Sequence, residues 1–460
     1  MRAALAFLDG LPQRPVRASA SAEALLRGYS APLPEQGSDP AEVVRDLAAI
    51  SDAGLTAMPS GRFFGWVIGG ALPAALGADW LVSAWDQNAG MAEPTPAAAA
   101  VEQVALRDVI DLLGLPATTS GALVTGAQMA NTTCLAAARN RVLRALGWDV
   151  EQDGLIGAPP VHVLVGAERH DTIMRSLRML GLGAGRAQVI ACDDQGRMRA
   201  DALGAQLAQL SGAVIVCAAV GNVNSGAIDP LPEINAAIAE ARTRLGSAAL
   251  WLHIDGAFGL WAAASPQLRA TIAGYERADS WTTDAHKWLN TPYDCGIALC
   301  ADADAQRRAM TVRAAYLPDQ DANAVRSPLD WTPEFSRRAR GFPIYAALRQ
   351  LGRSGVARLV EDSCRHARSF AQGLSAADGV EILNQVVLNQ VIVHFCDPSG
   401  RDHDAHTRRV VQQVQAEGTC FMSASVWQGR AVMRISVSNW STDADDVARS
   451  IESVLRAHRG

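Results

Sequence analysis

Residues 280–290 read SWTTDAHKWLN and contain Lys287, the single lysine of the chain. Of the 41 lysines and arginines, 40 are arginine. Arginine carries surface charge well, but its guanidinium is neither deprotonated nor nucleophilic in a protein, whereas a lysine amine forms a Schiff base with an aldehyde. The retained amine, flanked by His286 and Trp288, predicts that this position needs amine chemistry. Chance retention of one surface lysine is the alternative.

Short apolar runs on both sides of this stretch are typical of buried strands. They alternate with amphipathic segments of helical period, which predicts an α/β domain with a mostly parallel sheet. The runs are VHVLVG (161–166), AVIVCAAVG (213–221), ALWLHIDGAF (249–258) and GIALCA (296–301).

The pattern changes near both ends of the chain. Residues 1–60 carry one clear helical pattern, at 41–55, and we expect them to form an N-terminal helical arm. We assign residues 61–345 to the large domain. Beyond it, a long helical stretch precedes two strand candidates, which predicts a small C-terminal α+β domain over residues 346–460.

Composition excludes several classes of function. Hydrophobic residues make up 49% of the 460 residues and charged residues 19%, as in a folded protein. The net charge is −6 and no basic run exists, so we expect no nucleic-acid partner. The eight cysteines are scattered without a CxxC pair, which favours a reducing, cytoplasmic location.

Two further features argue against a membrane or metal function. Residues 63–85 are strongly apolar, but Pro73, Asp79 and several glycines favour a core or dimer-interface segment, so we expect no membrane span. His403 and His406 lie in a polar segment that reads as a solvated helix start, and we expect no metal site.

Polar residues and a glycine-containing turn lie where the fold class predicts a binding site. Ligands of a doubly wound sheet bind at the carboxyl ends of its strands. Asp255 ends the segment ALWLHID (249–255), Lys287 lies in TTDAHKW (282–288), and residues 124–134 (VTGAQMANTTC) form a strand-to-helix turn. Backbone N–H groups at such a turn, with Gly126 allowing close approach, can hold a phosphate without basic side chains.

Taken together, these motifs resemble the pyridoxal 5′-phosphate (PLP) decarboxylases of the aromatic-L-amino-acid and glutamate decarboxylase group. The resemblance implies an aspartate aminotransferase-like fold (fold type I) with a seven-stranded sheet, and a homodimer whose active sites lie at the subunit interface. It is carried by GRFFGWVIGGALPAALGADWL (61–81), GALVTGAQMANTTCLAAARNR (121–141), ERHDTIMRSLRMLGLG (168–183), VGNVNSGAIDPLPEI (220–234), WLHIDGAFG (251–259), DAHKWLN (284–290) and SRRARGFPIYAALRQLG (336–352).

The resemblance also implies roles for single residues. Lys287 matches the lysine that holds PLP as a Schiff base, and Asp255 the carboxylate that keeps the pyridine nitrogen protonated. A lone aspartate at a strand end could instead cap a helix. His170 matches the histidine that stacks on the ring. The remaining cofactor positions are Ala127, Gln128 and His286 at the phosphate, Asn222 at the phosphate or ring, and Ala257 under the ring.

The substrate is constrained only weakly. Trp66, Val67 and Met91 match segments that line the substrate pocket, which implies an apolar wall, although ordinary packing is the alternative. Arg434 resembles the arginine that meets the substrate carboxylate, or is a strand arginine paired with an acid. For an acidic side chain, Arg62 and Arg313 are the candidates.

One departure from the family pattern bears on the reaction. The aromatic members deliver a proton from a loop tyrosine, but residues 318–336 contain neither tyrosine nor histidine, and the nearest tyrosines are Tyr316 and Tyr345. The first hypothesis is decarboxylation of an L-amino acid to the amine and carbon dioxide through an external aldimine and a quinonoid. The alternatives are an aldehyde synthase or aldolase-type carbon-carbon lyase, and a non-catalytic scaffold.

Overall fold

The computed structural model describes residues 2–312 and 325–460. Arg313, Tyr316 and the beginning of the 318–336 segment lie outside these residues. The chain forms two compact units. The first consists of Met1–Gly70, His366–Leu383 and Val391–Gly460, and the second of Ala71–Arg365 and Asn384–Gln390. The domain boundaries expected at residues 60 and 345 stay predictions.

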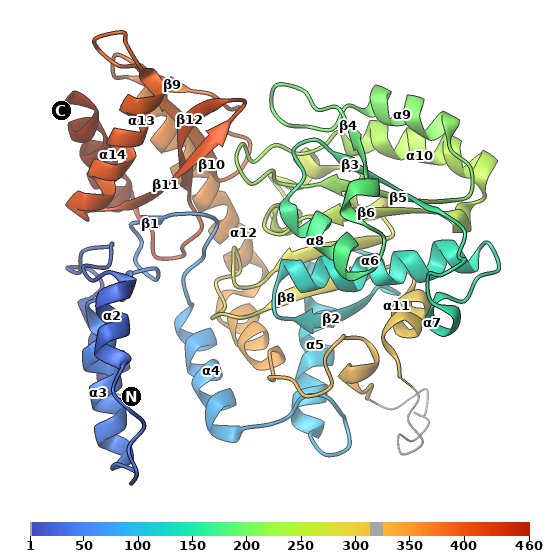
Figure 1. Ribbon diagram of the computed structural model, residues 1–460, viewed down its shortest axis with the longest axis horizontal. Helices are drawn as coiled ribbons and strands as arrows, with labels where there is room; N and C mark the ends of the chain where they lie inside the picture. The colour runs from blue at the N-terminus through green and yellow to red at the C-terminus, as the bar shows by residue number, and fades with distance from the viewer. Residues whose placement is uncertain (1, 313–324) are drawn as a thin grey trace. The chain divides into compact units, whose positions relative to one another are not determined.

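A seven-stranded sheet in the order β2-β8-β7-β6-β5-β3-β4 forms the centre of the second unit (Figure 1). Neighbouring strands from β4 to β7 are parallel, whereas β8 is antiparallel to both β7 and β2. The predicted α/β class with a mostly parallel sheet is confirmed. The strands are β2 (Ser120–Val124), β3 (Val161–Gly166), β4 (Gln188–Ile190), β5 (Ala213–Ala219), β6 (Leu250–Asp255), β7 (Ser280–Asp284) and β8 (Gly296–Cys300).

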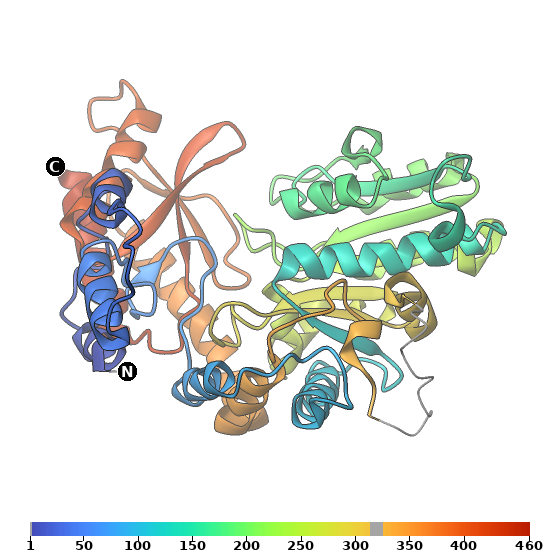
Figure 2. The same ribbon diagram turned by 60° about the horizontal axis from the view of Figure 1, so that its bottom comes forward.

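Helices cover this sheet, and α6 contacts most of its strands. It lies against β2, β3 and β5 to β8, with α8 and α11 beside it (Figures 1 and 2). The helices of this unit are α4 (Pro73–Trp85), α5 (Pro96–Leu112), α6 (Ala127–Arg144), α7 (Val150–Asp153), α8 (Asp171–Met179), α9 (Ala200–Gln209), α10 (Leu231–Leu245) and α11 (Ala303–Met310).

Several short 3-10 turns lie between the strands and helices of this unit, and one long helix follows them in the chain. The long helix α12 (Gly341–Ser375) is kinked at Gly352. The 3-10 turns are η1 (Ala184–Arg186), η2 (Ser247–Ala249), η3 (Gly259–Ala264), η4 (Arg269–Ile272), η5 (Tyr275–Arg277) and η6 (Pro328–Asp330).

Apolar side chains between α6, α8 and the sheet form a core of the second unit. Leu135 and Val142 of α6 and Leu177 of α8 pack with Val163 and Ile215 of the sheet, and all five are fully or almost fully buried. Burial of side chains on strands that are covered by helices explains why these strands read as continuous apolar runs. This core fixes the strand ends from which the polar residues project.

The first unit contains a five-stranded sheet in the order β1-β11-β12-β10-β9. β1 is parallel to β11, and β11 and β12 form an antiparallel pair. The elements of this unit are α1 (Arg2–Gly10), α2 (Ala22–Tyr29), α3 (Pro40–Asp52), β1 (Phe63–Phe64), β9 (Val380–Ile382), β10 (Gln390–Phe395), α13 (His403–Glu417), β11 (Phe421–Trp427), β12 (Arg430–Ser436) and α14 (Ala444–Arg459).

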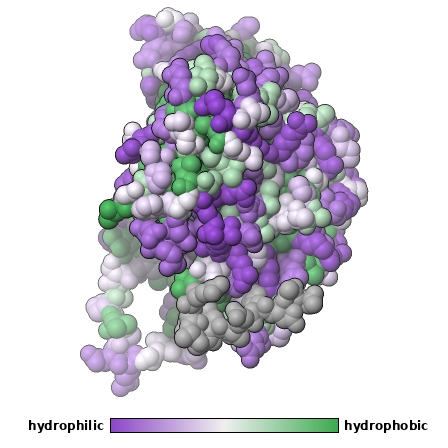
Figure 3. Space-filling view, turned by 90° about the vertical axis from the view of Figure 1, so that its right-hand side faces the viewer, coloured by the Kyte–Doolittle hydropathy of each residue, from purple (hydrophilic) through white to green (hydrophobic). Residues whose placement is uncertain are grey.

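Within the described ranges, no helix combines the length and the apolar character needed to cross a membrane. On the face of the molecule shown in Figure 3, hydrophilic side chains predominate and apolar ones are scattered among them. Scattered apolar side chains are normal on a protein surface.

Candidate active site

Lys287 follows the carboxyl end of β7 and is paired with the residue that ends this strand. Its Nζ lies 2.8 Å from Asp284 Oδ2, and the lysine side chain is 22% exposed while the aspartate is 1% exposed. The peptide N–H of Ala285 donates to the carbonyl of Cys295, which ties the segment after β7 to the residues before β8. The amine is therefore held at the sheet end and remains partly accessible.

A short chain of hydrogen bonds joins this ion pair to Asp255. Strand β6 ends at Asp255, and its Oδ1 accepts from the N–H of Ala257 at 3.2 Å. The carbonyl of Ala257 in turn accepts from the N–H of Asp284 at 2.8 Å. Because β6 and β7 are parallel neighbours, their carboxyl ends lie side by side. The structure thus brings Lys287, Asp255 and Ala257 together.

The predicted phosphate turn lies between β2 and α6. Strand β2 ends at Val124 and α6 begins at Ala127, and no side chain caps the N-terminus of this helix. A Cβ atom on Gly126 would lie 3.1 Å from His286 Cε1 and 3.7 Å from Asp284 Oδ1. The helix N-terminus, whose N–H groups and dipole favour an anion, is therefore adjacent to His286 and Asp284.

His286 is fixed from two sides. Its Nδ1 accepts from the N–H of Cys295 at 2.9 Å, and its ring stacks on Tyr293 with centroids 4.3 Å apart. Burial lowers the pKa of His286, and the nearby carboxylate of Asp284 opposes this shift. Since Nδ1 accepts, the ring hydrogen is on Nε2, which lies 3.6 Å from Asp284 Oδ1.

His170 is linked to Asp255 through two residues. It caps α8, and its Nδ1 accepts from the N–H of Thr172 at 3.2 Å and lies 2.9 Å from Thr172 Oγ1. Asn131 Nδ2 donates both to Thr172 Oγ1 at 3.2 Å and to Asp255 Oδ2 at 3.1 Å. The three residues predicted to be catalytic therefore lie around one network.

Gln128 and Asn222 use their side chains within the protein. Gln128 Nε2 donates to Ser176 Oγ at 3.0 Å, toward α8. Asn222 Oδ1 accepts from the N–H groups of Asn224 and Ser225, and its Nδ2 donates to the carbonyl of Glu168 at 3.1 Å. These bonds shape the turns next to the site.

The residues present fit a PLP cofactor. Near Lys287, the buried atoms Asp284 Oδ1, Trp288 Nε1 and Thr291 Oγ1 have no hydrogen-bond partner among the described residues. Buried polar atoms normally have partners, so these atoms leave capacity for a bound polar group. An amine for the aldehyde, a carboxylate for the ring nitrogen and an uncapped helix N-terminus for the phosphate are the groups that PLP requires.

The four predicted substrate residues are divided between the two units. Met91 belongs to the second unit, where its carbonyl accepts from Thr95 Oγ1 at 2.7 Å. Trp66, Val67 and Arg434 belong to the first unit, and their part in the site stays a prediction. Trp66 is 48% exposed, whereas Arg434 is 7% exposed and burial lowers its pKa to about 10.

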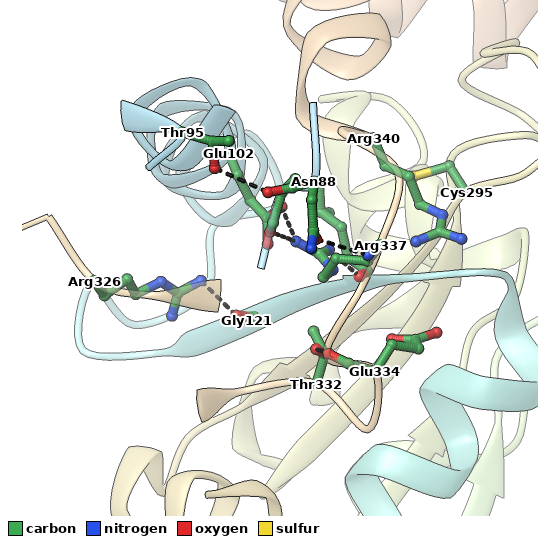
Figure 4. A network of polar contacts seen from close by, with 12 residues as sticks. Asn88, Thr95, Glu102, Gly121, Cys295, Arg326, Thr332, Glu334, Arg337 and Arg340 are labelled. Atoms are coloured by element: carbon green, nitrogen blue, oxygen red, sulfur yellow. Dashed lines mark hydrogen bonds and ion pairs between the residues drawn. The ribbon is translucent and has the colours of Figure 1, made fainter. Parts of the chain in front are cut away.

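Two arginines of the segment after residue 325, Arg326 and Arg337, form hydrogen bonds that support strand β2 (Figure 4). The guanidinium of Arg337 donates to Glu102 Oε2 at 2.6 Å, to the carbonyl of Ala89 at 2.9 Å and to the carbonyl of Leu123 at 2.5 Å. Arg326 donates to the carbonyl of Gly121 at 2.6 Å. Two arginines thus hold the strand that leads into the predicted phosphate turn.

Sheet, amine, carboxylate and turn together define an enzyme of the PLP-dependent class. Residues 23–395 match the pyridoxal-dependent decarboxylase conserved domain, and the chain belongs to this family. The chain is accordingly a PLP-dependent amino-acid carboxy-lyase, which removes the alternative of a non-catalytic scaffold.

Individual relatives include a decarboxylase and an aldehyde synthase, and a solved structure shares the fold. The chain is 29% identical over 391 residues to L-2,4-diaminobutyrate decarboxylase of Rhizobium meliloti (strain 1021), covering 84% of this chain and 75% of that protein. It is 26% identical over 424 residues to phenylacetaldehyde synthase of Arabidopsis thaliana, covering 86% and 81% of the two chains. The crystal structure of Oryza sativa TDC with PLP and tryptamine has the same fold, with a TM-score of 0.89 at 22% identity over 100% of this chain and 96% of that chain.

Sequence reasoning missed two contributors to the site. Asp284 lies three residues before Lys287, a spacing that could have pointed to the ion pair. Asn131 gave no such signal, because its contact with Asp255 joins residues 124 positions apart.

Proposed function

We propose that the protein removes the α-carboxylate of an L-amino acid as carbon dioxide and returns the amine, with Lys287, Asp255 and His170 as its catalytic residues. Bound PLP supplies an aldehyde that condenses with amines and a ring that accepts the electron pair of the breaking bond. Asp255 accepts a hydrogen bond from the protonated ring nitrogen. Lys287 holds and releases the cofactor, and His170 faces the ring.

Other residues hold the cofactor without taking part in bond breaking. The N–H groups at Ala127 and Gln128 and the ring of His286 receive the phosphate, since a helix N-terminus favours an anion. Asn222 shapes the neighbouring turn, and Ala257 lies under the ring. The single observation that carries the proposal is the connection from Lys287 through Asp284 and Ala257 to Asp255.

A panel of L-amino acids tests the proposal. The PLP-loaded protein is assayed for carbon dioxide, amine, aldehyde and peroxide, with Lys287→Ala as the control. We expect carbon dioxide and amine in equal amounts from at least one amino acid, and loss of turnover in the variant. Turnover that Lys287→Ala retains would contradict the assigned role of the amine.

Aldehyde formation is the second candidate, and the segment 318–336, without tyrosine or histidine, favours it. A relative at 26% identity is a phenylacetaldehyde synthase. In that reaction the amino acid, dioxygen and water give aldehyde, carbon dioxide, ammonia and peroxide, so the two electrons pass to dioxygen. Peroxide equal to carbon dioxide in the panel would select this outcome, and cleavage of a β-hydroxy amino acid to an aldehyde without carbon dioxide would select the aldolase alternative.

For the substrate, we propose an apolar wall formed by Trp66, Val67 and Met91, and a carboxylate contact at Arg434. A largely buried guanidinium suits a carboxylate because desolvation strengthens the charge-assisted hydrogen bond. Arg434→Lys should raise KM more than it lowers kcat if the arginine binds the carboxylate.

We also propose that the protein is a homodimer and is cytoplasmic. Helices α2 and α3 of the first unit expose Leu26, Val43, Val44 and Leu47, with between 51% and 66% of each side chain accessible. A second copy would cover such apolar faces. No disulfide joins the described cysteines, which suits a reducing compartment. Light scattering at several concentrations, compared with Val44→Asp/Leu47→Asp, tests the dimer.

A further inference from the structure

A buried line of polar groups ends on the carboxylate of Asp255. Trp251, His253 and Asp255 alternate along β6, so their side chains lie on one face of the strand. Trp251 Nε1 donates to Ser280 Oγ at 2.8 Å, and Ser280 Oγ lies 2.9 Å from His253 Nδ1. His253 Nε2 lies 2.8 Å from Asn131 Oδ1, and Asn131 Nδ2 donates to Asp255 Oδ2 at 3.1 Å.

The two ends of this line give every bond in it one direction. An indole N–H can only donate, so Ser280 Oγ accepts from Trp251 and keeps its own hydrogen for another acceptor. A carboxylate can only accept, so the NH2 group of Asn131 faces Asp255 and its oxygen faces His253. His253 Nε2 therefore carries a hydrogen, and because burial keeps the ring neutral, His253 Nδ1 accepts from Ser280.

Burial makes this arrangement costly to break. Ser280, His253 and Asn131 are 0% exposed and Trp251 is 2% exposed. Burial also lowers the pKa of His253 to about 4, in agreement with a neutral ring. Hydrogen bonds that share one direction polarise one another, so the last donor to Asp255 is strengthened by those before it.

We propose that His253 and Asn131 are positioning residues that orient Asp255 and keep it a hydrogen-bond acceptor for the ring nitrogen of PLP. Asn131 holds Oδ2 and the N–H of Ala257 holds Oδ1, which fixes the plane of the carboxylate. This inference rests on the proposed pairing of Asp255 with the cofactor. The residues act through Asp255 and do not themselves contact the reacting atoms.

Asn131→Asp is the sharpest test, because it keeps the shape and removes the donor. The new carboxylate still accepts from His253 but faces Asp255 with a second acceptor. We expect the dissociation constant for PLP to rise roughly ten-fold or more, since a hydrogen bond to a charged group is lost, and the pH dependence of the bound cofactor's visible absorbance to shift. The matched control is Asn235→Asp on α10, because Asn235 is a buried amide that donates to the carbonyl of Gly274.

A pair of variants at His253 keeps the test decisive if Asn131→Asp does not fold. The amide of His253→Gln can accept from Ser280 and donate to Asn131, so it should keep PLP affinity within about three-fold of the native value, whereas His253→Leu should lose roughly ten-fold. A merely structural role would make Gln and Leu differ in melting temperature but not in the titration of the cofactor.

The outcomes separate this inference from the proposed function. Suppose that Lys287→Ala abolishes turnover, while the cofactor absorbance of Asn131→Asp and His253→Leu depends on pH as in the native protein. The positioning role is then wrong and the proposed function stands. If Lys287→Ala leaves turnover intact, the proposed function itself fails.

Discussion

The amine of Lys287 lies 2.8 Å from the carboxylate of Asp284, which is 1% exposed. Removing one partner of a buried ion pair leaves the other charge uncompensated, which is far more destabilising than removing both. This relationship makes Lys287, whose amine we propose to bind PLP, also a structural cation in the protein without PLP.

We therefore predict that Lys287→Ala lowers the free energy of unfolding of the PLP-free protein by roughly 3 kcal/mol. The double variant Lys287→Ala/Asp284→Asn should recover most of this loss, because no buried charge remains alone. Urea unfolding of the native protein, both single variants and the double variant completes the cycle. A double variant less stable than Lys287→Ala would show that the pair does not interact in this way.

The neutral state of His253 predicts a dependence of stability on pH. Its pKa in the folded protein is about 4, below the ordinary 6.5, because of burial. Between these values the unfolded chain binds the proton and the folded protein does not, so stability is complete above pH 6.5 and is lost as the pH falls toward 4. The contribution is on the order of 3 kcal/mol. His253→Gln should flatten the slope of unfolding free energy against pH over this window, and an unchanged slope would contradict the assignment.

Arg337→Lys should weaken both the fold and PLP binding. An ammonium cannot reproduce the planar fork that reaches Glu102, Ala89 and Leu123. We expect a loss of about 2 kcal/mol in urea unfolding and a higher dissociation constant for PLP, since Leu123 lies just before the phosphate turn. Arg338→Lys is the control, because that arginine is 36% exposed and pairs with Asp79. Equal effects of the two changes would exclude a special role for Arg337.

Gly296→Ala should displace the turn between β2 and α6, where we propose that the phosphate binds. A Cβ atom there would lie 2.4 Å from the carbonyl carbon of Gly126, so one of the two backbone segments must move. We predict a dissociation constant for PLP raised roughly ten-fold, as for the loss of one charge-assisted hydrogen bond. Gly77→Ala on α4 meets nothing within 4 Å and should leave binding unchanged. Native affinity in Gly296→Ala would show that the turn tolerates the shift.

Much of the sheet could be predicted from sequence because most of its strands are apolar and covered. The runs at 161–166, 213–221, 249–258 and 296–301 correspond to β3, β5, β6 and β8. Strand β7 was not predicted, since Ser280, Thr282 and Thr283 resemble a turn although all three are fully buried. The antiparallel direction of β8 also leaves no mark in its own residues.

Residues of the candidate site could be predicted where the chemistry of the side chain itself suggests a role. A lone lysine and an aspartate at a strand end are such residues. The line from Trp251 to Asp255 could not be predicted in this way, because it joins β6, β7 and α6, and His253 by itself reads as a core residue. Long-range hydrogen bonds of this kind depend on the fold and not on local pattern.

Borohydride reduction of the PLP-loaded protein, followed by tryptic digestion and mass spectrometry, tests the central claim most directly. Lys287 is the only lysine, so a blocked amine prevents cleavage after it and leaves one peptide that spans residues 278–307. We predict that this peptide carries the reduced cofactor and is absent from Lys287→Arg. Cleavage after Lys287 in the reduced protein, with the cofactor lost or attached elsewhere, would contradict the account.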